Sequence, residues 1–483
     1  MSILSVNFLF FLLLLTIIYY IVPDKVKPFV ILSGNIYFYL QFDLRYSLFL
    51  LFSILTVFFG AIFIEHAKTQ KIRKTILGVI LSVNIALLFF VKFVPYILTK
   101  AQIFFTYDPS GIIDNIIVPV GIAFYTLQLS GYLIDVYRSK YHTERNFLKF
   151  SAFSTFFPLM LQGPISRYDQ LSEQVYNKSK RKDIYRNYTY GAQLMLWGFF
   201  KKLIIADRVA LLVNEVFNNF TTYSGFIVII AVLFYTIQIY TDFSGCVDIC
   251  RGAAKLFGID VIENFNQPYF SKSIQDFWRR WHIALSSWFR DYLYIPLGGN
   301  RKGIVRKYIN ILIVFFVSGL WHGVGIHYIV WGIMQGVFQI TGALTLPFKE
   351  KLSAKMKIDR SKGFALLLQY LATFVLINLS WLVFRANGIK AAIKMFGSIF
   401  TFAPITAPLP ALTVPDLIII GIALILMFVV SYFKEKGYCI RDTIAKAYLP
   451  VRWLIFLSGF AVILIFGIYG PGYSDASFIY MNF

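Results

Sequence analysis

The chain has 483 residues, of which 58% are hydrophobic, 19% aromatic and only 14% charged, and its mean hydropathy is +0.67. Soluble domains carry about 25% charged residues, so this composition excludes an ordinary soluble globular protein and predicts a polytopic membrane protein. The net charge of +22 would suggest a nucleic-acid ligand in a soluble chain. Here the basic residues cluster in short segments between apolar runs, which is typical of cytoplasmic loops, so we expect no nucleic-acid partner.

About twelve apolar runs alternate with short polar loops and predict transmembrane helices. In chain order they cover residues 3–22, 29–40, 46–64, 76–97, 118–137, 188–205, 224–240, 308–327, 328–346, 364–384, 412–433 and 453–469. We expect the first run to be retained as a span, because neither a basic n-region nor a small-residue cleavage site marks it as a removable signal peptide. No internal repeat indicates an inverted-repeat transporter.

The basic segments predict the orientation of these helices. With the N-terminus outside, the clusters at 68–74 and 138–149 lie inside, and the loop at 98–115 lies outside. The first half of the chain then follows the positive-inside rule. The basic tracts at 178–182 and 349–362 show the same bias.

Two segments do not fit a simple transmembrane helix. Residues 153–163 are too short and too broken by proline and glycine to cross a bilayer, so we expect a re-entrant or buried segment enclosed by protein. Residues 274–297 predict one amphipathic helix that lies flat at an interface or on the floor of a membrane cavity. Its apolar arc contains Phe277, Trp278, Trp281, Ala284, Leu285, Trp288, Phe289 and Tyr292. Its polar arc contains Arg279, Arg280, Ser286, Ser287, Arg290 and Asp291.

The most informative stretch is Ser318-Gly319-Leu320-Trp321-His322-Gly323, which lies inside a hydrophobic run at 308–335. An ionisable side chain at membrane depth is costly and indicates a functional site by default. Burial without a carboxylate partner keeps an imidazole neutral, as a general base must be. The alternative is a histidine that packs between helices, and Gly319 and Gly323 also match a helix-packing motif. Trp321 and Trp331 either line a pocket or belong to an aromatic belt.

The other histidines are His66, His142, His282 and His327. His66 and His142 lie in basic loops, where we expect them to be solvated. His282 lies at the border between the two arcs of the amphipathic helix, so it faces either a polar pocket or the lipid headgroups. His322 and His327 are five residues apart and would lie on different faces of a helix. Since no HExxH motif or carboxylate cluster accompanies them, we expect no metal site.

Signatures of several other chemistries do not occur in the sequence. It contains no GxSxG elbow, no Walker loop and no GxGxxG motif after a strand. The three cysteines form no CxxC pair, so they predict neither a disulfide framework nor a zinc site. Cys246 and Cys250 are best interpreted as small buried hydrophobic residues.

Basic residues on and after the amphipathic helix allow two interpretations. Arginine forks suit phosphate groups, so these residues could attract an anionic cytosolic donor such as a coenzyme A thioester. The positive-inside rule explains the same residues without a ligand. They are Arg279, Arg280, Arg290, Arg301, Lys302, Arg306 and Lys307.

A series of ordered motifs runs from Pro119 to Ala386. They are 119–126 with 132–138, Phe156-Phe157-Pro158 with Gly163-Pro164-Ile165, Phe199-Phe200-Lys201-Lys202 with Ala206-Asp207-Arg208, Asp242-Phe243-Ser244-Gly245, 277–286 with 289–299, 318–323, and Trp381-Leu382-Val383-Phe384-Arg385-Ala386. In this combination the chain resembles the membrane-bound O-acyltransferase (MBOAT) family. Within the family it is similar to the bacterial alginate O-acetyltransferase (AlgI) type, with peptidoglycan O-acetyltransferases of the PatA kind included.

The resemblance implies an all-α polytopic membrane fold, built as a single MBOAT transmembrane domain over residues 1–483. N-terminal helices would occupy 1–115, the MBOAT core 116–390 and C-terminal helices 391–483. We expect about 11 to 13 transmembrane helices, with re-entrant and amphipathic helices, around a central funnel or tunnel.

The resemblance also implies an enzyme of the bacterial plasma (inner) membrane. It would move acetyl groups from a cytosolic thioester donor, such as acetyl-CoA, across the membrane for O-acetylation of a cell-surface polysaccharide. We expect no bound cofactor, contact with membrane lipid, and a periplasmic SGNH-type acetyltransferase as partner. Alternatives are D-alanyl transfer to teichoic acids, as in the DltB type, and a polysaccharide transporter or flippase, which the scarcity of intramembrane acidic residues disfavours.

In this family the histidine of the Trp-His-Gly motif is catalytic, which corresponds to His322. A second important polar residue on the amphipathic helix corresponds to His282, which would orient a substrate or assist protonation of the leaving thiolate. We expect further substrate contacts from residues of the same two motifs. These are Arg279, Arg280, Trp281, Ser286, Arg290, Asp291, Trp321 and Ser318.

Overall fold

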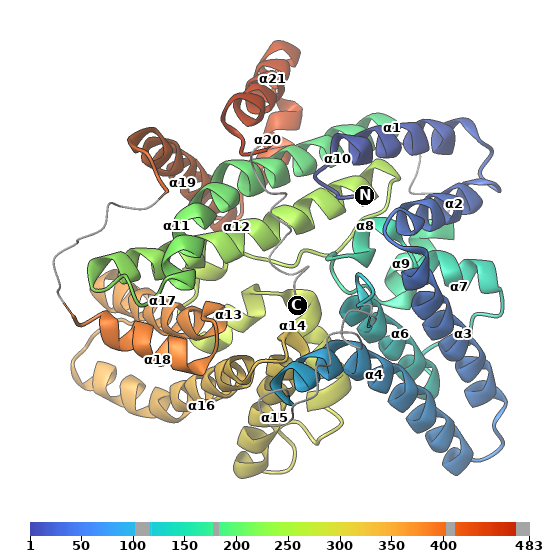
Figure 1. Cartoon of the computed structure of the whole chain (residues 1–483), viewed down its shortest axis with the longest axis horizontal. Helices are drawn as coiled ribbons and strands as arrows, with labels where there is room; N and C mark the ends of the chain where they lie inside the picture. Colours follow the sequence, from blue (N-terminus) through green and yellow to red (C-terminus); the bar gives the residue numbers. More distant parts are fainter. Residues whose placement is uncertain (102–115, 117, 177–182, 402–410, 470–483) are drawn as a thin grey trace. The chain divides into compact units, whose positions relative to one another are not determined.

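The structure is a computed structural model of the chain, and it describes residues 1–101, 116, 118–176, 183–401 and 411–469 (Figure 1). Within these ranges the regular elements are helices, and the β pairing is limited to one isolated bridge between Phe265 and Trp281. The prediction of an all-α, multi-pass membrane protein is confirmed, since eight described helices are long and apolar enough to cross a membrane. The predicted outer loop beyond Ala101 and the basic tract at 178–182 lie outside the described residues.

Each apolar run predicted from the sequence lies on a helix. The eight of membrane-spanning length are α3 (Leu44–His66), α4 (Gln70–Ala101), α12 (Phe226–Leu256), α15 (Ile304–His322), α16 (Ile326–Lys355), α17 (Gly363–Arg385), α19 (Val414–Glu435) and α21 (Leu449–Phe466). The other four runs lie on the shorter helices α1 (Val6–Ile21), α2 (Lys27–Leu40), α6 (Ile122–Tyr137) and α10 (Ile184–Phe199). The remaining elements are α7 (Phe147–Ser154), α8 (Phe157–Met160), α9 (Tyr168–Tyr176), η2 (Phe200–Ala206), α11 (Asp207–Asn218), η3 (Pro268–Phe270), α13 (Ile274–Arg280), α14 (Ile283–Phe289), η4 (Arg290–Tyr294), α18 (Ile389–Ser398) and α20 (Ile440–Lys446).

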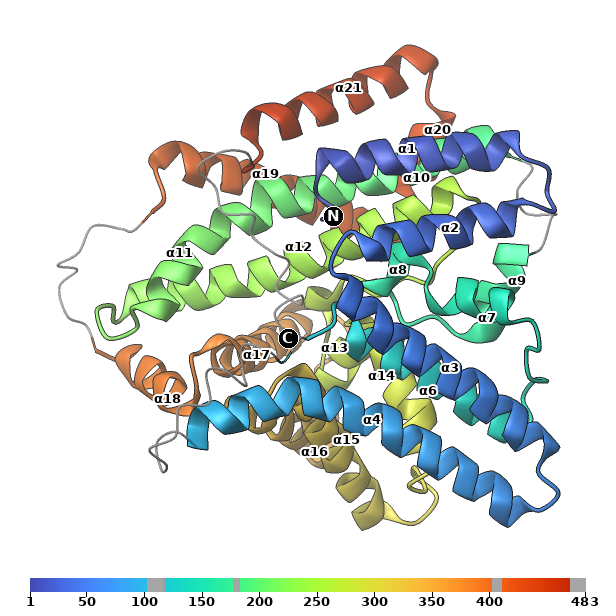
Figure 2. The ribbon, with the colours of Figure 1, turned by 45° about the vertical axis from the view of Figure 1, so that its right-hand side comes forward.

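Contacts between the helices divide the chain into two compact units. The first unit comprises Met1–Met195 and Val247–Ile262, and the second comprises Leu196–Cys246 and Glu263–Phe483. In the first unit α3, α4 and α6 pack against one another, as Figure 2 shows. In the second unit α15, α16 and α17 form a sequential series of packed helices.

The segment predicted to be buried, residues 153–163, lies in the first unit and is buried throughout. It contains the end of α7 and the single turn α8. Asn35 of α2, itself 0% exposed, donates to the Thr155 hydroxyl over 3.2 Å and accepts from the Phe157 backbone N–H over 3.0 Å. An irregular backbone inside a membrane protein needs such internal partners, because lipid offers none. The prediction of a buried, protein-enclosed segment is confirmed.

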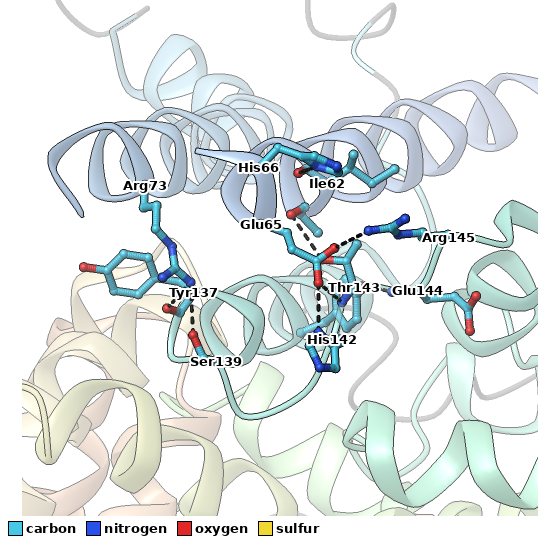
Figure 3. A network of polar contacts seen from close by, with 12 residues as sticks. Ile62, Glu65, His66, Arg73, Tyr137, Ser139, His142, Thr143, Glu144 and Arg145 are labelled. Atoms are coloured by element: carbon cyan, nitrogen blue, oxygen red, sulfur yellow. Dashed lines mark hydrogen bonds and ion pairs between the residues drawn. The ribbon is translucent and has the colours of Figure 1, made fainter. Parts of the chain in front are cut away.

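The loops that follow α3 and α6 lie at the same end of the first unit (Figure 3). Arg73 donates through Nη2 to the Tyr137 carbonyl oxygen and to the Ser139 hydroxyl, each over 3.1 Å. Glu65 accepts from the backbone N–H of Thr143 over 3.4 Å. The positive-inside rule requires the basic segments 68–74 and 138–149 to share one side of the membrane, and these contacts agree with that requirement.

The amphipathic segment of the second unit is not one continuous helix, so that prediction is wrong. Helix α13 ends at Arg280 and α14 begins at Ile283, while His282 between them has a left-handed φ of 46°. The backbone N–H groups of Ile283 and Ala284 donate to the backbone and side-chain oxygens of Asn264 over 3.0 and 2.9 Å. The first N–H groups of a helix lack acceptors within the helix. Asn264 supplies acceptors for two of them, so α14 can begin at Ile283 and need not continue from α13. After Phe289 the segment continues as the π-helix η4.

Candidate active site

The corner between α15 and α16 positions His322, which is the last residue of α15. Gly323 ends the helix, and its N–H donates to the Gly319 carbonyl oxygen over 3.2 Å. A Cβ atom at Gly319 would collide with the Tyr328 carbonyl oxygen of α16, and one at Gly332 would collide with the Phe315 carbonyl oxygen of α15. The glycines therefore let the two backbones approach closely, and the helix-packing interpretation of Gly319 is confirmed.

The His322 side chain is enclosed by aromatic rings. It is 2% exposed, and its ring centroid lies 4.9 Å from Trp321, 5.1 Å from Trp331 and 5.4 Å from Phe384. All three rings meet the imidazole edge to face, at interplanar angles of 77°, 90° and 80°. The imidazole is therefore packed among aromatic side chains and shielded from bulk water.

His282 also contacts Trp321. Its ring lies 6.1 Å from the Trp321 ring and 4.8 Å from the Phe243 ring, and the side chain is 1% exposed. The structure thus brings the two predicted histidines to one indole, which both of them contact. Burial lowers the pKa of His282 to about 3, so this imidazole is neutral near pH 7. The interpretation of His282 as a solvated headgroup contact is wrong, because the ring is buried.

Three buried tryptophans of the second unit contact one another, and we call them, with Trp278 and Phe384, the aromatic cluster. Trp281, Trp331 and Trp381 are among the largest fully buried side chains of the described residues. The Trp381 ring lies 5.2 Å from Trp281 and 6.0 Å from Trp331, and Trp278 lies 5.9 Å from Trp331. The interpretation of Trp331 as part of an interfacial aromatic belt is therefore wrong. Trp381 and Phe384 were not identified as site residues, although both belong to the motif at 381–386.

Three more of the predicted contact residues, Ser318, Trp281 and Ser286, lie near the two histidines. Ser318, 4% exposed, lies one helical turn before His322, and Trp281 is 1% exposed within the aromatic cluster. The Ser286 hydroxyl donates to the Trp281 carbonyl oxygen over 3.3 Å. These three residues therefore lie in or beside the aromatic surroundings of the two histidines.

The predicted arginine contacts lie farther toward solvent. Arg279 is exposed, and Arg290 forms an exposed ion pair with Asp291 over 2.8 Å. Arg280 contacts Glu435 over 2.7 Å and Asp276 over 3.2 Å. Its hydrogen bond to Glu435 is the first cause that raises the pKa of Arg280. Arg280 thus has protein carboxylates for partners, and a role in substrate binding stays a prediction.

A buried ion triad lies in the same unit. Lys202 of η2 contacts Asp207 over 2.8 Å and Asp242 over 2.5 Å, and the three side chains are 2%, 8% and 1% exposed. Asp242 is the neighbour of Phe243, the residue whose ring packs on His282. The motifs 199–202 with 206–208 and 242–245 contain all three residues, but the sequence alone gave them no role.

The other histidines do not join this site. His142 is fully exposed and lies 3.1 Å from Glu65 in the first unit, while His66 contacts the Ile62 carbonyl oxygen over 2.8 Å (Figure 3). Both histidines are exposed, as predicted, but His66 is the last residue of α3 and does not lie in a loop. The His327 ring packs against Tyr328 with the centroids 4.1 Å apart and the planes tilted by 40°. Over the described ranges, no group of three or more potential metal-binding side chains occurs.

Comparisons with known proteins match this region of the chain. The model of the MBOAT, membrane-bound O-acyltransferase family, matches residues 36–382. The "Probable alginate O-acetylase AlgI" of Pseudomonas syringae pv. tomato is 37% identical over 60% of this chain, a match that spans only 53% of that relative. The protein of the same name from Azotobacter vinelandii is 33% identical, and the match covers 91% of this chain and 85% of the relative. The "Peptidoglycan O-acetyltransferase" of Helicobacter pylori is 32% identical over 75% of this chain and 71% of its own length.

Proposed function

The chain belongs to the membrane-bound O-acyltransferase family, and we propose that it transfers acetyl groups for the O-acetylation of a bacterial cell-surface polysaccharide. The names of its relatives, which act on alginate or peptidoglycan, support this substrate class. The observation that carries the proposal is a pair of buried histidines, His322 and His282, that both contact Trp321. Localisation in the bacterial plasma (inner) membrane is part of the same proposal.

In the proposed reaction His322 is the general base. It takes the proton of an acceptor hydroxyl while the hydroxyl oxygen forms a bond to the carbonyl carbon of an acetyl thioester. The carbon–sulfur bond then breaks, and the leaving thiolate receives the proton from His322. General-base assistance contributes about 10²–10⁴-fold to such a rate, and fixed positions of the reactants contribute the remainder.

His282 acts as a neutral hydrogen-bonding group in this proposal. Because burial lowers its pKa to about 3, it is uncharged near pH 7 and its remaining N–H is too weak an acid to protonate a thiolate. An uncharged imidazole can still donate one hydrogen bond and accept another. We therefore assign it the orientation of the acyl donor or the acceptor, and not the protonation of the leaving group.

The proposed donor is acetyl-CoA or another cytosolic acyl thioester. Arg279, Arg301 and Lys302 are exposed basic residues that can attract its phosphate groups. A periplasmic SGNH-type acetyltransferase is the proposed partner that passes the acetyl group to the polysaccharide. No bound cofactor is needed for these steps.

The test is transfer of labelled acetyl groups by the purified chain in lipid vesicles, with acetyl-CoA as donor. His322→Ala is expected to lower transfer by at least about 10²-fold, since it removes the base. His142→Ala is the matched control, because that histidine is exposed and lies in the first unit. Full transfer by a well-folded His322→Ala variant would overturn the role of His322. In a parallel assay with a D-alanyl thioester as donor, transfer of D-alanine but not of acetyl would replace the proposed reaction with D-alanylation of a teichoic acid.

A further inference from the structure

The indole N–H of Trp331 is a buried donor beside the proposed base. Trp331 lies on α16, is 1% exposed, and has its ring centroid 5.1 Å from that of His322. Over the residues that the structure describes, its Nε1 has no hydrogen-bond partner. Buried tryptophan N–H groups usually have a hydrogen-bond acceptor. A buried donor without an acceptor carries a desolvation cost that no hydrogen bond offsets.

Trp278, in the same cluster, shows how the protein supplies a partner where the role is structural. Its Nε1 donates to Gln335 Oε1 over 3.2 Å, and Gln335 Nε2 donates to the Ser380 hydroxyl over 2.7 Å. Gln335 and Ser380 are both 0% exposed. Among the described residues Trp278 therefore has an internal acceptor, whereas the indole Nε1 atoms of Trp331 and Trp381 have none, and Trp331 packs on His322 at 5.1 Å.

The proposed reaction creates an acceptor of the required kind next to His322. When the acceptor oxygen attacks the thioester, the carbonyl π electrons move to the carbonyl oxygen and give it a negative charge. A fixed N–H donor in a water-excluded site stabilises that charge more strongly in the transition state than in the ground state. The charge is transient, so the donor needs no protein partner before the reaction.

We propose that the indole N–H of Trp331 donates a hydrogen bond to the carbonyl oxygen of the acyl group during transfer. This inference rests on the proposed acyl transfer and adds a catalytic residue to it. Trp331 keeps its proton throughout. The oxygen's electron pair re-forms the carbonyl bond as the carbon–sulfur bond breaks, and the proton that His322 took passes to the thiolate.

The decisive variant is Trp331→Phe, which keeps an aromatic ring and removes the donor. We expect kcat with acetyl-CoA to fall by about 10²–10³-fold, with little change in KM, because the bond forms in the transition state. Trp278→Phe is the matched control. It leaves Gln335 without its donor, so we expect a lower melting temperature than that of the wild type. We expect its fall in kcat to be much smaller than that of Trp331→Phe.

A second measurement separates catalysis from packing. Replacing the donor carbonyl oxygen with sulfur, in dithioacetyl-CoA, weakens the hydrogen-bond acceptor. The wild-type protein should then lose rate relative to acetyl-CoA, and Trp331→Phe should show a much smaller ratio between the two donors. An unchanged kcat for Trp331→Phe, or an equal ratio in both proteins, would overturn the inference. Failure of the wild-type protein to transfer acetyl would instead overturn the proposed function.

Discussion

Lys202 and His322 lie in the same unit and are equally buried, at 2% exposure, but the protein surrounds them with different chemistry. The Lys202 ammonium group lies within 2.8 Å of two carboxylates, those of Asp207 on α11 and Asp242 on α12. His322 has three aromatic rings around it. In the first region the protein itself compensates the charge. In the second, aromatic rings pack against a titratable side chain.

The difference separates a structural polar group from a chemical one. A buried ion pair returns its desolvation cost only when its geometry is good, and it then resists any change of charge. A neutral imidazole among rings gains a proton only when a nearby atom becomes more acidic or a negative charge develops. Burial alone would therefore not have distinguished Lys202 from His322, whereas their partners do.

The largest expected effect comes from breaking the triad. Lys202→Met leaves Asp207 and Asp242 buried without their cation, and we expect a loss of about 3–5 kcal/mol in the free energy of unfolding. The measurement is denaturant unfolding in detergent, or the yield of folded protein. A triple variant with Met at 202 and Leu at 207 and 242 should regain most of the stability. If the single variant is as stable as the wild type, the triad is not a structural unit.

A smaller loss is expected at the close approach of α15 and α16. Gly319→Ala places a methyl group against the Tyr328 carbonyl oxygen, which should cost about 1–3 kcal/mol in the free energy of unfolding. It should also displace the side chain of His322, which lies one helical turn farther along α15. Gly342→Ala is the control on α16, because a Cβ at that position would meet no described atom within 4 Å apart from the local backbone of its own helix. That variant should stabilise the helix by up to about 1 kcal/mol. Equal stability of the two variants would contradict the packing role of Gly319.

The neutral state of His282 predicts a pH dependence of stability. Its pKa is about 3 in the folded protein and about 6.5 in the unfolded chain, so above pH 6.5 neither state is protonated. As the pH falls toward 3, only the unfolded state takes up this proton, and stability declines by about 1.4 kcal/mol per unit.

His282→Gln should remove this component. The measurement compares unfolding of the variant and the wild type at pH 7.5 and pH 5.5, with His142→Gln as the exposed control. A smaller loss of stability on acidification is expected for His282→Gln alone. The same loss in all three proteins would mean that His282 is protonated in the folded state.

The sequence predicted the helices and the principal histidine because both signals are local. Apolar runs report membrane helices directly, and the motif around His322 lies within six consecutive residues. The break at His282 was not predictable from periodicity, because Asn264 supplies the acceptors that let a new helix begin there. Asp242, which contacts Lys202, and Phe384, which contacts His322, come from helices far along the chain from those residues. Only the ordered motifs, which contain Phe243 and Trp381, indicated that these segments belong together.

The smallest expected effect concerns an exposed ion pair of nearly the same length as the one between Lys202 and Asp207. Lys434 and Glu263 lie 3.0 Å apart, but their side chains are 40% and 36% exposed. Water already solvates both charges, so Lys434→Met should change the free energy of unfolding by no more than about 1 kcal/mol. Measured beside Lys202→Met, this variant tests whether burial, and not the presence of an ion pair, sets the cost. Losses of equal size would show that the pair at Lys202 owes nothing to its buried position.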